Sequence, residues 1–229
     1  MNISEIFYTI QGEGQYLGYP SIFVRTSGCN IRCEWCDTPY TSWDPEKNII
    51  DVHDVMDKVE ELIPIDFLPH VVITGGEPYL QNDLPEFVNL LKQRQLFVTI
   101  ETNGTIFIPT KVDFLSISPK LSTSAPRNEK WVAIHNEKRL NFEALKSMMN
   151  SCEFQLKFVV DTPSDFKEID TIVESLGSDV RKFVILMPQG RRKHELSQKY
   201  KIIADHCLKK GYRMTPRLHV DIWGDVRGR

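Results

Sequence analysis

Short runs of apolar and β-branched residues alternate along this chain with longer segments whose apolar residues recur every three or four positions. The first pattern predicts buried strands and the second predicts amphipathic helices. Strands that alternate with helices form parallel βαβ units, because the chain must cross back over the sheet before the next strand can run in the same direction. The alternation therefore predicts an α/β protein with a largely parallel sheet.

The pattern predicts strands at 20–25, 70–74, 96–101, 113–118, 154–160, 183–187 and 212–220. It predicts helices at 51–63, 84–94, 142–149, 163–176 and 195–210, with Thr162 as the N-cap of the fourth. About six βα units are too few for a closed eight-unit barrel. A partial (β/α)6-type TIM barrel and an open doubly wound sheet both fit this count. In either fold the functional loops lie at the carboxyl ends of the strands.

The length of 229 residues suits one domain with a sizeable core, so we expect 1–229 to form a single unit. Residues 121–140 are polar and predict an irregular excursion or lid. The net charge of -3 gives no electrostatic case for binding nucleic acid. No apolar run approaches the length of a membrane span, and the N-terminus lacks a basic region before an apolar core. We therefore expect a cytoplasmic protein with no membrane partner.

Residues 26–40 form a loop that holds three cysteines within eight positions, at Cys29, Cys33 and Cys36. Thiolates select iron–sulfur clusters, zinc or copper(I) over hard cations. A four-iron cluster needs four ligands, so three cysteines would leave one iron open to a substrate or cofactor. The alternatives are a zinc site completed by a nearby His or Asp, and a disulfide between two of the cysteines. The odd total of five cysteines suits a reducing compartment.

Polar residues and glycines follow most of the expected strands. These segments are Arg25 with the cysteine loop, T-G-G-E-P at 74–78, E-T-N-G at 101–104, S-I-S-P-K at 116–120, and Pro188-Gln189, with His219 in the last strand. Because the carboxyl ends of parallel strands meet at one rim, these residues predict a single site there. Two adjacent glycines also allow a ligand or another backbone to approach closely.

The C-x3-C-x2-C spacing, with Trp35 before the last cysteine, resembles the cluster motif of radical S-adenosylmethionine (SAM) enzymes. Further segments are similar to one family of these enzymes, the 7-carboxy-7-deazaguanine synthases (the QueE family). They are I-Q-G-E-G at 10–14, C-D-T-x-Y at 36–40, V-I-T-G-G-E-P at 72–78, I-E-T-N-G-T at 100–105, S-I-S-P-K at 116–120 and R-L-H-V-D-I-W-G at 217–224. The resemblance covers most of the chain and is weakest over 121–150.

The resemblance implies a carbon–nitrogen lyase that contracts 6-carboxy-5,6,7,8-tetrahydropterin to 7-carboxy-7-deazaguanine with loss of ammonia. This step belongs to the biosynthesis of queuosine, a tRNA modification, and of other 7-deazapurines. The implied cofactors are a [4Fe–4S] cluster, SAM and Mg2+, with a 5′-deoxyadenosyl radical formed when the cluster cleaves SAM. The implied partners are the pterin, a flavodoxin-like or other reductant, and a second copy in a homodimer.

Carried over position by position, the resemblance implies roles for individual residues. The cluster ligands are Cys29, Cys33 and Cys36, and the Mg2+ ligand is Thr38. SAM is bound by Gly75, Gly76, Glu77, Glu101, Ser118, Lys120 and Gln189. The substrate is bound by Gln11, Glu13, Gly14, Arg25, Thr74 and His219, of which Glu13, Arg25 and His219 are the catalytic candidates. Each also has an ordinary interpretation, such as a turn cap for Thr38, a surface ion pair for Arg25 and a core position for His219.

Two other functions fit the cysteine spacing. One is a different radical SAM activity, such as that of a glycyl-radical activating enzyme, and residues 11–14 together with Thr38 argue against it. The other is a non-catalytic iron–sulfur or zinc module that binds a partner. That interpretation would leave the polar residues at the strand ends without a purpose.

Overall fold

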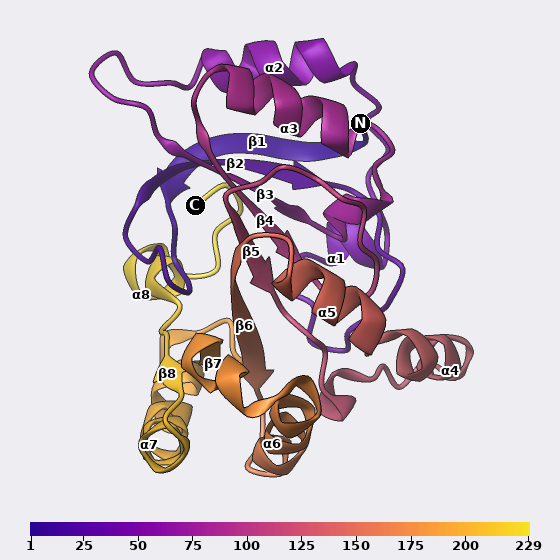
Figure 1. The fold of residues 1–229 in the computed structure, drawn as a ribbon, viewed down its shortest axis with the longest axis vertical. Helices are drawn as coiled ribbons and strands as arrows, with labels where there is room; N and C mark the ends of the chain where they lie inside the picture. Colours follow the sequence, from indigo (N-terminus) through magenta and orange to yellow (C-terminus); the bar gives the residue numbers. More distant parts are fainter.

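The computed structural model describes residues 1–229, and its eight strands form one curved sheet (Figure 1). The strands are β1 (Ile3–Ile10), β2 (Pro20–Thr26), β3 (His70–Gly75), β4 (Phe97–Thr102), β5 (Phe114–Ile117), β6 (Glu153–Val160), β7 (Val184–Pro188) and β8 (Arg213–Met214). Strand β1 is antiparallel to β2, and every later neighbouring pair is parallel.

The order of the strands distinguishes the two expected architectures. A doubly wound sheet contains a point at which the strand order reverses. Here the order runs from β1 to β8 without reversal, so the partial barrel is confirmed. Strand β8 does not pair with β1, and the barrel stays open.

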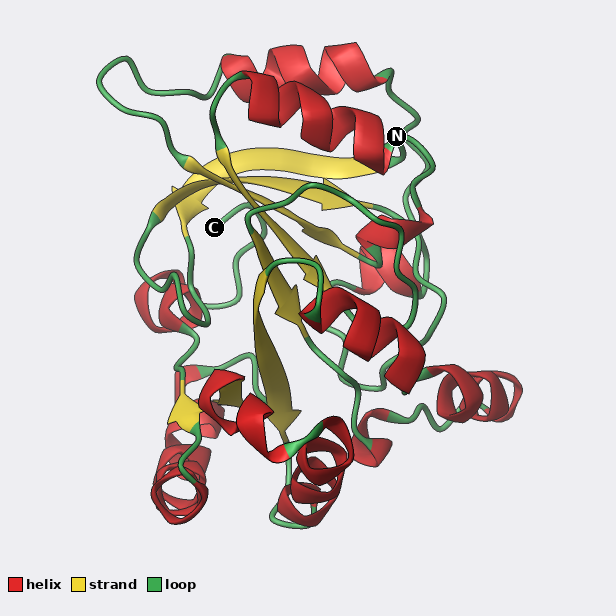
Figure 2. Ribbon diagram, viewed as in Figure 1, coloured by secondary structure: helices red, strands yellow, loops and turns green.

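Helices cover the outer face of the sheet (Figure 2). They are α1 (Pro39–Ser42), α2 (Val52–Glu60), α3 (Leu84–Gln93), α4 (Glu129–Lys138), α5 (Phe142–Met149), α6 (Asp165–Leu176), α7 (Lys193–Lys210) and α8 (Leu218–Trp223). Short 3-10 turns are η1 (Pro78–Leu80), η2 (Ser122–Ser124) and η3 (Ser178–Phe183). The expected helices at 51–63, 84–94, 142–149, 163–176 and 195–210 all form, with ends shifted by a few residues. None of the helices is long and apolar enough to cross a membrane.

The two faces of the strands differ in chemistry, and this difference positions the site. Alternate residues such as Val71, Ile73 and Ile100 belong to the apolar core that packs against the helices. The residues between them point the other way, because successive side chains on a strand face opposite sides. In the middle of the sheet these inward residues include Thr74 and Glu101, so the inside of the barrel is polar while its outside is apolar.

The first strand was not predicted. Residues 3–10 form β1, and five of its eight side chains, including Ser4, Glu5 and Phe7, are only partly buried. Such a segment carries neither a continuous apolar run nor a strict alternation, which are the two strand patterns. It pairs with β2 from Ile3 opposite Thr26 to Ile10 opposite Pro20.

The prediction that 121–140 is irregular is wrong, because this segment contains η2 and the ten-residue helix α4. Only His135 of this helix is buried, so the sequence has almost no apolar stripe to indicate a helix. The available signal was a cap: Asn128 accepts a hydrogen bond from the backbone N–H of Trp131.

The prediction of a strand over 212–220 is also wrong after Met214. Strand β8 ends at Met214, and Leu218–Trp223 forms α8, so His219 lies on a helix. Pro216 explains the break, because proline has no N–H to donate to a strand ladder. The N-cap prediction at Thr162 is wrong as well: α6 begins at Asp165, whose carboxylate instead accepts the backbone N–H of Thr162.

Candidate active site

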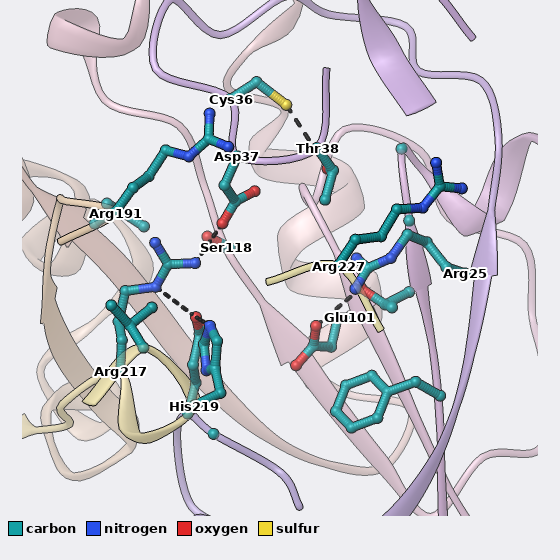
Figure 3. Close-up of a pocket in the computed structure, with 18 of the residues that line it drawn as sticks. Arg25, Cys36, Asp37, Thr38, Glu101, Ser118, Arg191, Arg217, His219 and Arg227 are labelled. Carbon is teal, nitrogen blue, oxygen red and sulfur yellow. Dashed lines mark hydrogen bonds and ion pairs between the residues drawn. The ribbon is translucent and has the colours of Figure 1, made fainter. Parts of the chain in front are cut away.

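A cavity of about 340 Å3 lies inside the barrel at the carboxyl ends of the parallel strands (Figure 3). Most of the residues predicted for the site line it. They are Gln11, Glu13, Arg25, Cys29, Cys33, Cys36, Thr38, Thr74, Gly75, Gly76, Glu101, Ser118, Lys120 and His219. Segments from both ends of the chain therefore meet at one place, as the strand-end pattern predicted.

The three cysteines of the loop after β2 are free thiols on the wall of this cavity. Burial raises the pKa of Cys29 to about 11 and that of Cys33 to about 12, so both stay neutral until a cation binds. No three His, Cys, Asp or Glu side chains converge closely enough to hold a single metal ion. Three neighbouring thiols on one wall are soft ligands that could hold an iron–sulfur cluster.

Gly75 and Gly76 bring the cysteine loop against the end of β3. The Gly76 N–H donates to the Thr26 carbonyl at 3.2 Å, and the Glu77 N–H donates to the Gly28 carbonyl at 2.9 Å. A Cβ on Gly75 would overlap the Thr26 backbone, and one on Gly76 would overlap the Gly28 carbonyl. Gly75 also has a φ of 128°, where a side chain is strained. The pair therefore sets how closely the cysteine loop approaches the cavity.

Glu101, at the end of β4, joins three elements. Its carboxylate accepts a hydrogen bond from Gln11 Nε2 at 3.1 Å and another from Thr74 Oγ1 at 2.9 Å. Farther along the rim, Lys120 Nζ donates to Ser118 Oγ at 2.9 Å. These polar groups all line the cavity, from the first residues after β1 to the residues after β5.

Glu13 lies at the centre of a buried charge network. Its carboxylate contacts Lys157 Nζ at 2.5 Å and Arg217 Nε at 3.0 Å, and His219 Nε2 lies 4.0 Å away. Lys157 and Arg217 are only 5% and 7% exposed. Burial alone would raise the pKa of Glu13, but the two cations outweigh it and hold the pKa well below its usual range. The carboxylate is therefore ionised at every physiological pH.

Arg217 extends this network to the cysteine loop. Besides Glu13 it forms an ion pair with Asp37, the residue directly after Cys36, and its Nη1 donates to the Gly190 carbonyl at 2.7 Å. Burial opposes ionisation of Asp37, yet Arg217 lowers the pKa of this carboxyl below its usual value. The last cysteine is thus tied through one guanidinium to the start of the chain and to α8.

His219 and Arg25 approach the cavity from different sides. The His219 ring lies directly against Gly12, where any side chain would collide with it. Burial lowers the pKa of His219 although Glu13 acts in the opposite direction, so the ring is neutral near pH 7. Arg25 donates from Nε to Glu5 at 2.6 Å and lies 5.6 Å from the Phe7 ring centroid. Its cation is therefore already paired within the protein.

Thr38 is the N-cap residue of α1, but its side chain forms no capping hydrogen bond. Its hydroxyl lies 3.8 Å from Cys36 Sγ and accepts from Thr41 Oγ1 at 3.3 Å. The oxygen thus stays on the cavity wall beside the last cysteine.

Three predicted site residues do not line the cavity. Glu77 is fully buried beneath the rim, Gln189 accepts a hydrogen bond from Lys199 Nζ on α7, and Gly14 lies against the Gln155 side chain. The Glu77 carboxylate accepts from the backbone N–H groups of Tyr79 and Asn103 and from Thr102 Oγ1. Burial nevertheless raises the pKa of Glu77 to about 7.

The sequence interpretation missed Lys157, Arg217, Asp37 and the C-terminal tail. A lysine inside the apolar run of β6 was an available signal, because a buried lysine needs a carboxylate partner. The tail 225–229 also lines the cavity. Arg227 pairs with Glu5 at 3.1 Å and Glu46 at 2.8 Å, and its guanidinium lies 4.1 Å from the Tyr40 ring centroid.

Comparison with known proteins agrees with this geometry. A model described as the radical SAM superfamily matches residues 23–121. The 7-carboxy-7-deazaguanine synthase of Halobacterium salinarum is 40% identical, over 98% of this chain and 91% of the relative. That of Rhodopirellula baltica is 37% identical, over 99% of this chain and 88% of the relative. The crystal structure of QueE from Escherichia coli superposes with a TM-score of 0.72 at 25% identity, covering 95% of this chain and 93% of that one.

Proposed function

The chain belongs to the 7-carboxy-7-deazaguanine synthase family of the radical SAM superfamily, and from this membership we propose the reaction that its cavity serves. The protein converts 6-carboxy-5,6,7,8-tetrahydropterin to 7-carboxy-7-deazaguanine with loss of ammonia. The observation that carries this proposal is that three thiols and the ionised Glu13 network share one cavity. A cluster site alone would need only the thiols.

The residues present fit a cluster and SAM. The three thiols would hold a [4Fe–4S] cluster, and Gly75, Gly76, Glu101, Ser118 and Lys120 would surround SAM beside it. When bound, these cofactors supply the electron and the carbon radical that the ring contraction requires. The chain's own contribution is to position SAM and the pterin within one cavity.

The Glu13 network supports recognition of the pterin. A pterin presents amide and amino N–H groups on one edge, and an ionised carboxylate can only accept hydrogen bonds. Lys157 and Arg217 keep Glu13 in this acceptor state, and Gln11 adds a neutral amide next to it. The ring of His219, whose Nε2 lies 4.0 Å from Glu13, is neutral. It can accept a proton at one ring nitrogen and donate one from the other. We infer that these side chains orient the substrate edge.

Arg25 and Thr38 are proposed to act on the substrate carboxylate. A guanidinium binds carboxylates with charge-assisted hydrogen bonds, so Arg25 would exchange part of its contact with Glu5 for the substrate. The Thr38 hydroxyl is a hard oxygen ligand of the kind that Mg2+ prefers. We propose that Thr38 would supply one oxygen ligand to Mg2+, with the substrate carboxylate as another ligand.

The Mg2+ proposal predicts the behaviour of Thr38→Ala. This variant should lose most of the Mg2+ stimulation of turnover, on the order of tenfold, because one oxygen ligand is removed. Its iron content should match that of the unaltered protein, since Thr38 is not a thiol ligand. Turnover measured against Mg2+ concentration tests this, with Thr171→Ala on α6 as the control, since that exposed hydroxyl bonds only the Lys167 carbonyl. An unchanged Mg2+ response in Thr38→Ala would contradict the role.

The decisive experiment for the reaction is anaerobic reconstitution with iron and sulfide, followed by incubation with SAM, a reductant and the carboxytetrahydropterin. We expect a product with the mass of 7-carboxy-7-deazaguanine, and no product from Cys33→Ala. Deoxyadenosine formed without that product would favour a different radical SAM activity. Zinc bound at the thiols in material purified without oxygen would favour a non-catalytic module.

Further properties belong to the same proposal. Loss of ammonia breaks a carbon–nitrogen bond, so we infer a lyase. We propose that residues 1–229 act as one domain, that a flavodoxin-like protein or another reductant supplies the electron, and that the enzyme is a cytoplasmic homodimer. Its five free cysteines support a reducing compartment. Light scattering of the purified protein tests the dimer.

A further inference from the structure

Asn103 lies on the cavity wall directly after β4 and has a side chain next to a cysteine of the cluster loop. The residue is only 5% exposed. Its Nδ2 lies 3.8 Å from Cys29 Sγ and 3.1 Å from Asn30 Oδ1. An amide nitrogen carries two hydrogens, so both contacts can form at once. Asn103 is the one side-chain donor within hydrogen-bond distance of Cys29 Sγ.

The orientation of this amide is fixed by its other atoms. Oδ1 of Asn103 accepts from the Thr105 backbone N–H at 3.0 Å and from Thr105 Oγ1 at 2.6 Å. The Asn103 backbone N–H donates to the buried carboxylate of Glu77 at 2.7 Å. A flipped amide would place its NH2 group against the Thr105 donors and leave the sulfur facing an acceptor. The hydrogen-bond network therefore directs an N–H group at the sulfur.

Two neighbours show how this contact is held from both sides. The Asn30 side chain, one residue after Cys29, accepts from Asn103 and donates from its Nδ2 to Thr105 Oγ1 at 2.8 Å. Asn30, Asn103 and Thr105 thus form a closed ring of hydrogen bonds between the cysteine loop and the end of β4. Such a ring leaves the amide little freedom to turn away from Cys29.

We propose that Asn103 raises the reduction potential of the cluster bound at Cys29 by donating a hydrogen bond to the thiolate. Reduction adds negative charge to the cluster and its sulfurs, and a donor aimed at a sulfur stabilises that added charge. The effect is stronger in a buried site, where water does not screen the amide dipole. Asn103 is a positioning residue in this role: it forms no covalent bond to the cluster and transfers no proton. The inference depends on the cluster part of the proposed function but not on the identity of the substrate.

The test is a redox titration of the reconstituted cluster, followed by electron paramagnetic resonance, without SAM or substrate. Asn103→Leu has a similar volume but no donor, so its midpoint potential should be more negative. We expect the ratio of reduced to oxidised cluster at a fixed potential to fall on the order of tenfold, equivalent to about 59 mV for one electron. Asn103→Asp keeps the oxygen that accepts from Thr105 and places a negative charge near the sulfur, so its shift should be larger.

Controls separate this role from a structural one. Thr110→Ala lies on the same connection between β4 and β5, and its hydroxyl bonds only the Ile108 carbonyl, so its midpoint should not move. Should Asn103→Leu fail to keep its cluster, Thr105→Val removes one of the two anchors of the amide and should give a smaller shift of the same sign. If Asn103→Leu, or Thr105→Val should Asn103→Leu lose its cluster, has the same midpoint potential as the unaltered protein, the proposal is overturned. If the midpoint potentials shift as predicted but the unaltered protein forms no deazaguanine product, the proposed function is overturned and this inference is not.

Discussion

Arg217 connects two carboxylates that come from distant parts of the sequence. Its planar guanidinium contacts Glu13 through Nε and Asp37 through Nη2, while Lys157 contacts Glu13 and, at 3.9 Å, Glu101. A guanidinium presents several donors in fixed directions, whereas an ammonium is a single compact charge. Arginine is therefore the residue that can hold the substrate wall and the cysteine loop in one geometry.

Substitutions of Arg217 should separate charge from geometry. Arg217→Lys keeps the charge but loses the contact with one of the two carboxylates, so we expect a higher KM for the pterin with a smaller change in the KM for SAM.

Arg217→Met leaves Glu13 and Asp37 without the cation that they share, and it should lower the free energy of unfolding by about 3–5 kcal/mol. Urea unfolding of the cluster-free protein measures this. The exposed pair of Arg94 with Glu60 is the control, and Arg94→Met should cost about 0–1 kcal/mol. Equal losses in the two methionine variants would contradict the argument.

Glu77 shows a different kind of buried carboxylate. It has three hydrogen-bond donors and forms no ion pair, and burial raises its pKa from 4.5 to about 7, although the Lys120 cation acts in the opposite direction. It connects the end of β3 to the end of β4 through Thr102 and Asn103. Its charge state should therefore affect how firmly these two strand ends are held together.

The raised pKa of Glu77 predicts the pH dependence of folding. A carboxyl whose folded pKa exceeds its unfolded value stabilises the fold below pH 4.5, and this contribution is lost as the pH rises through about 7. Between pH 5 and pH 7.5 the loss is roughly 2–3 kcal/mol. Urea unfolding of the cluster-free protein at the two pH values should show this decrease. In Glu77→Gln, which does not ionise, the decrease should be smaller by that amount, and the same pH dependence in both proteins would refute the assignment.

At the scale of single elements, α4 is the part that holds the cysteine loop from outside the barrel. The Arg32 guanidinium lies 4.1 Å from the Trp131 ring centroid, and its Nη1 donates to the Cys29 carbonyl at 2.7 Å. The Glu34 N–H donates to the Ser124 carbonyl at 2.9 Å. The segment that the sequence presented as a loose excursion is thus a support for the cluster ligands.

Trp131→Ala tests this support. Removing the ring leaves Arg32 without its stacking partner, and a cation over a tryptophan face contributes about 0.5–2 kcal/mol. We expect the cysteine loop to be more mobile and the iron content after anaerobic reconstitution to fall measurably. Lys130→Ala on the exposed side of the same helix is the control and should retain full iron content. Equal iron content in the two variants would show that α4 does not hold the loop.

The elements that the sequence predicted well share a physical property. Strands such as β3 and helices such as α3 bury a complete face, so their periodicity is visible in the residues. Strand β1 and helices α4 and α8 bury little, and their positions depend on contacts with distant segments. The same holds for the site. Motifs next to strands indicated most of its wall, but the pairing of Lys157 and Arg217 with Glu13 is a tertiary contact that no local pattern encodes.

On the scale of the whole molecule, the open barrel leaves a gap between its first and last strands that other segments fill. Figure 1 shows the C-terminal tail running back from α8 towards β1 and β2. Arg227 anchors it to Glu5 and Glu46, and Arg191 pairs with Asp225 at 2.7 Å. The tail is therefore a structural wall of the cavity, held at two points.

Arg227→Ala removes one of these two anchors. We expect faster amide hydrogen exchange over 224–229 and a KM for the pterin that rises more than kcat falls, because a loosened wall must be ordered again on binding. Exchange in β3, which forms no ion pair with Arg227, should not change. Lys201→Ala, which breaks an exposed pair within α7, is the control and should leave both measurements unaltered. Unchanged exchange of the tail in Arg227→Ala would show that the anchor has no effect.

The paired glycines at the end of β3 also limit how this enzyme could be redesigned. One side of the cavity there is bare backbone, so it has no side chain to trim for a bulkier substrate. Nor can this side be extended for a smaller substrate, because an added methyl group would overlap the Thr26 backbone or the Gly28 carbonyl. Changes in the range of accepted molecules must therefore come from parts of the wall that carry replaceable side chains, such as Phe7, Phe23 and Met187.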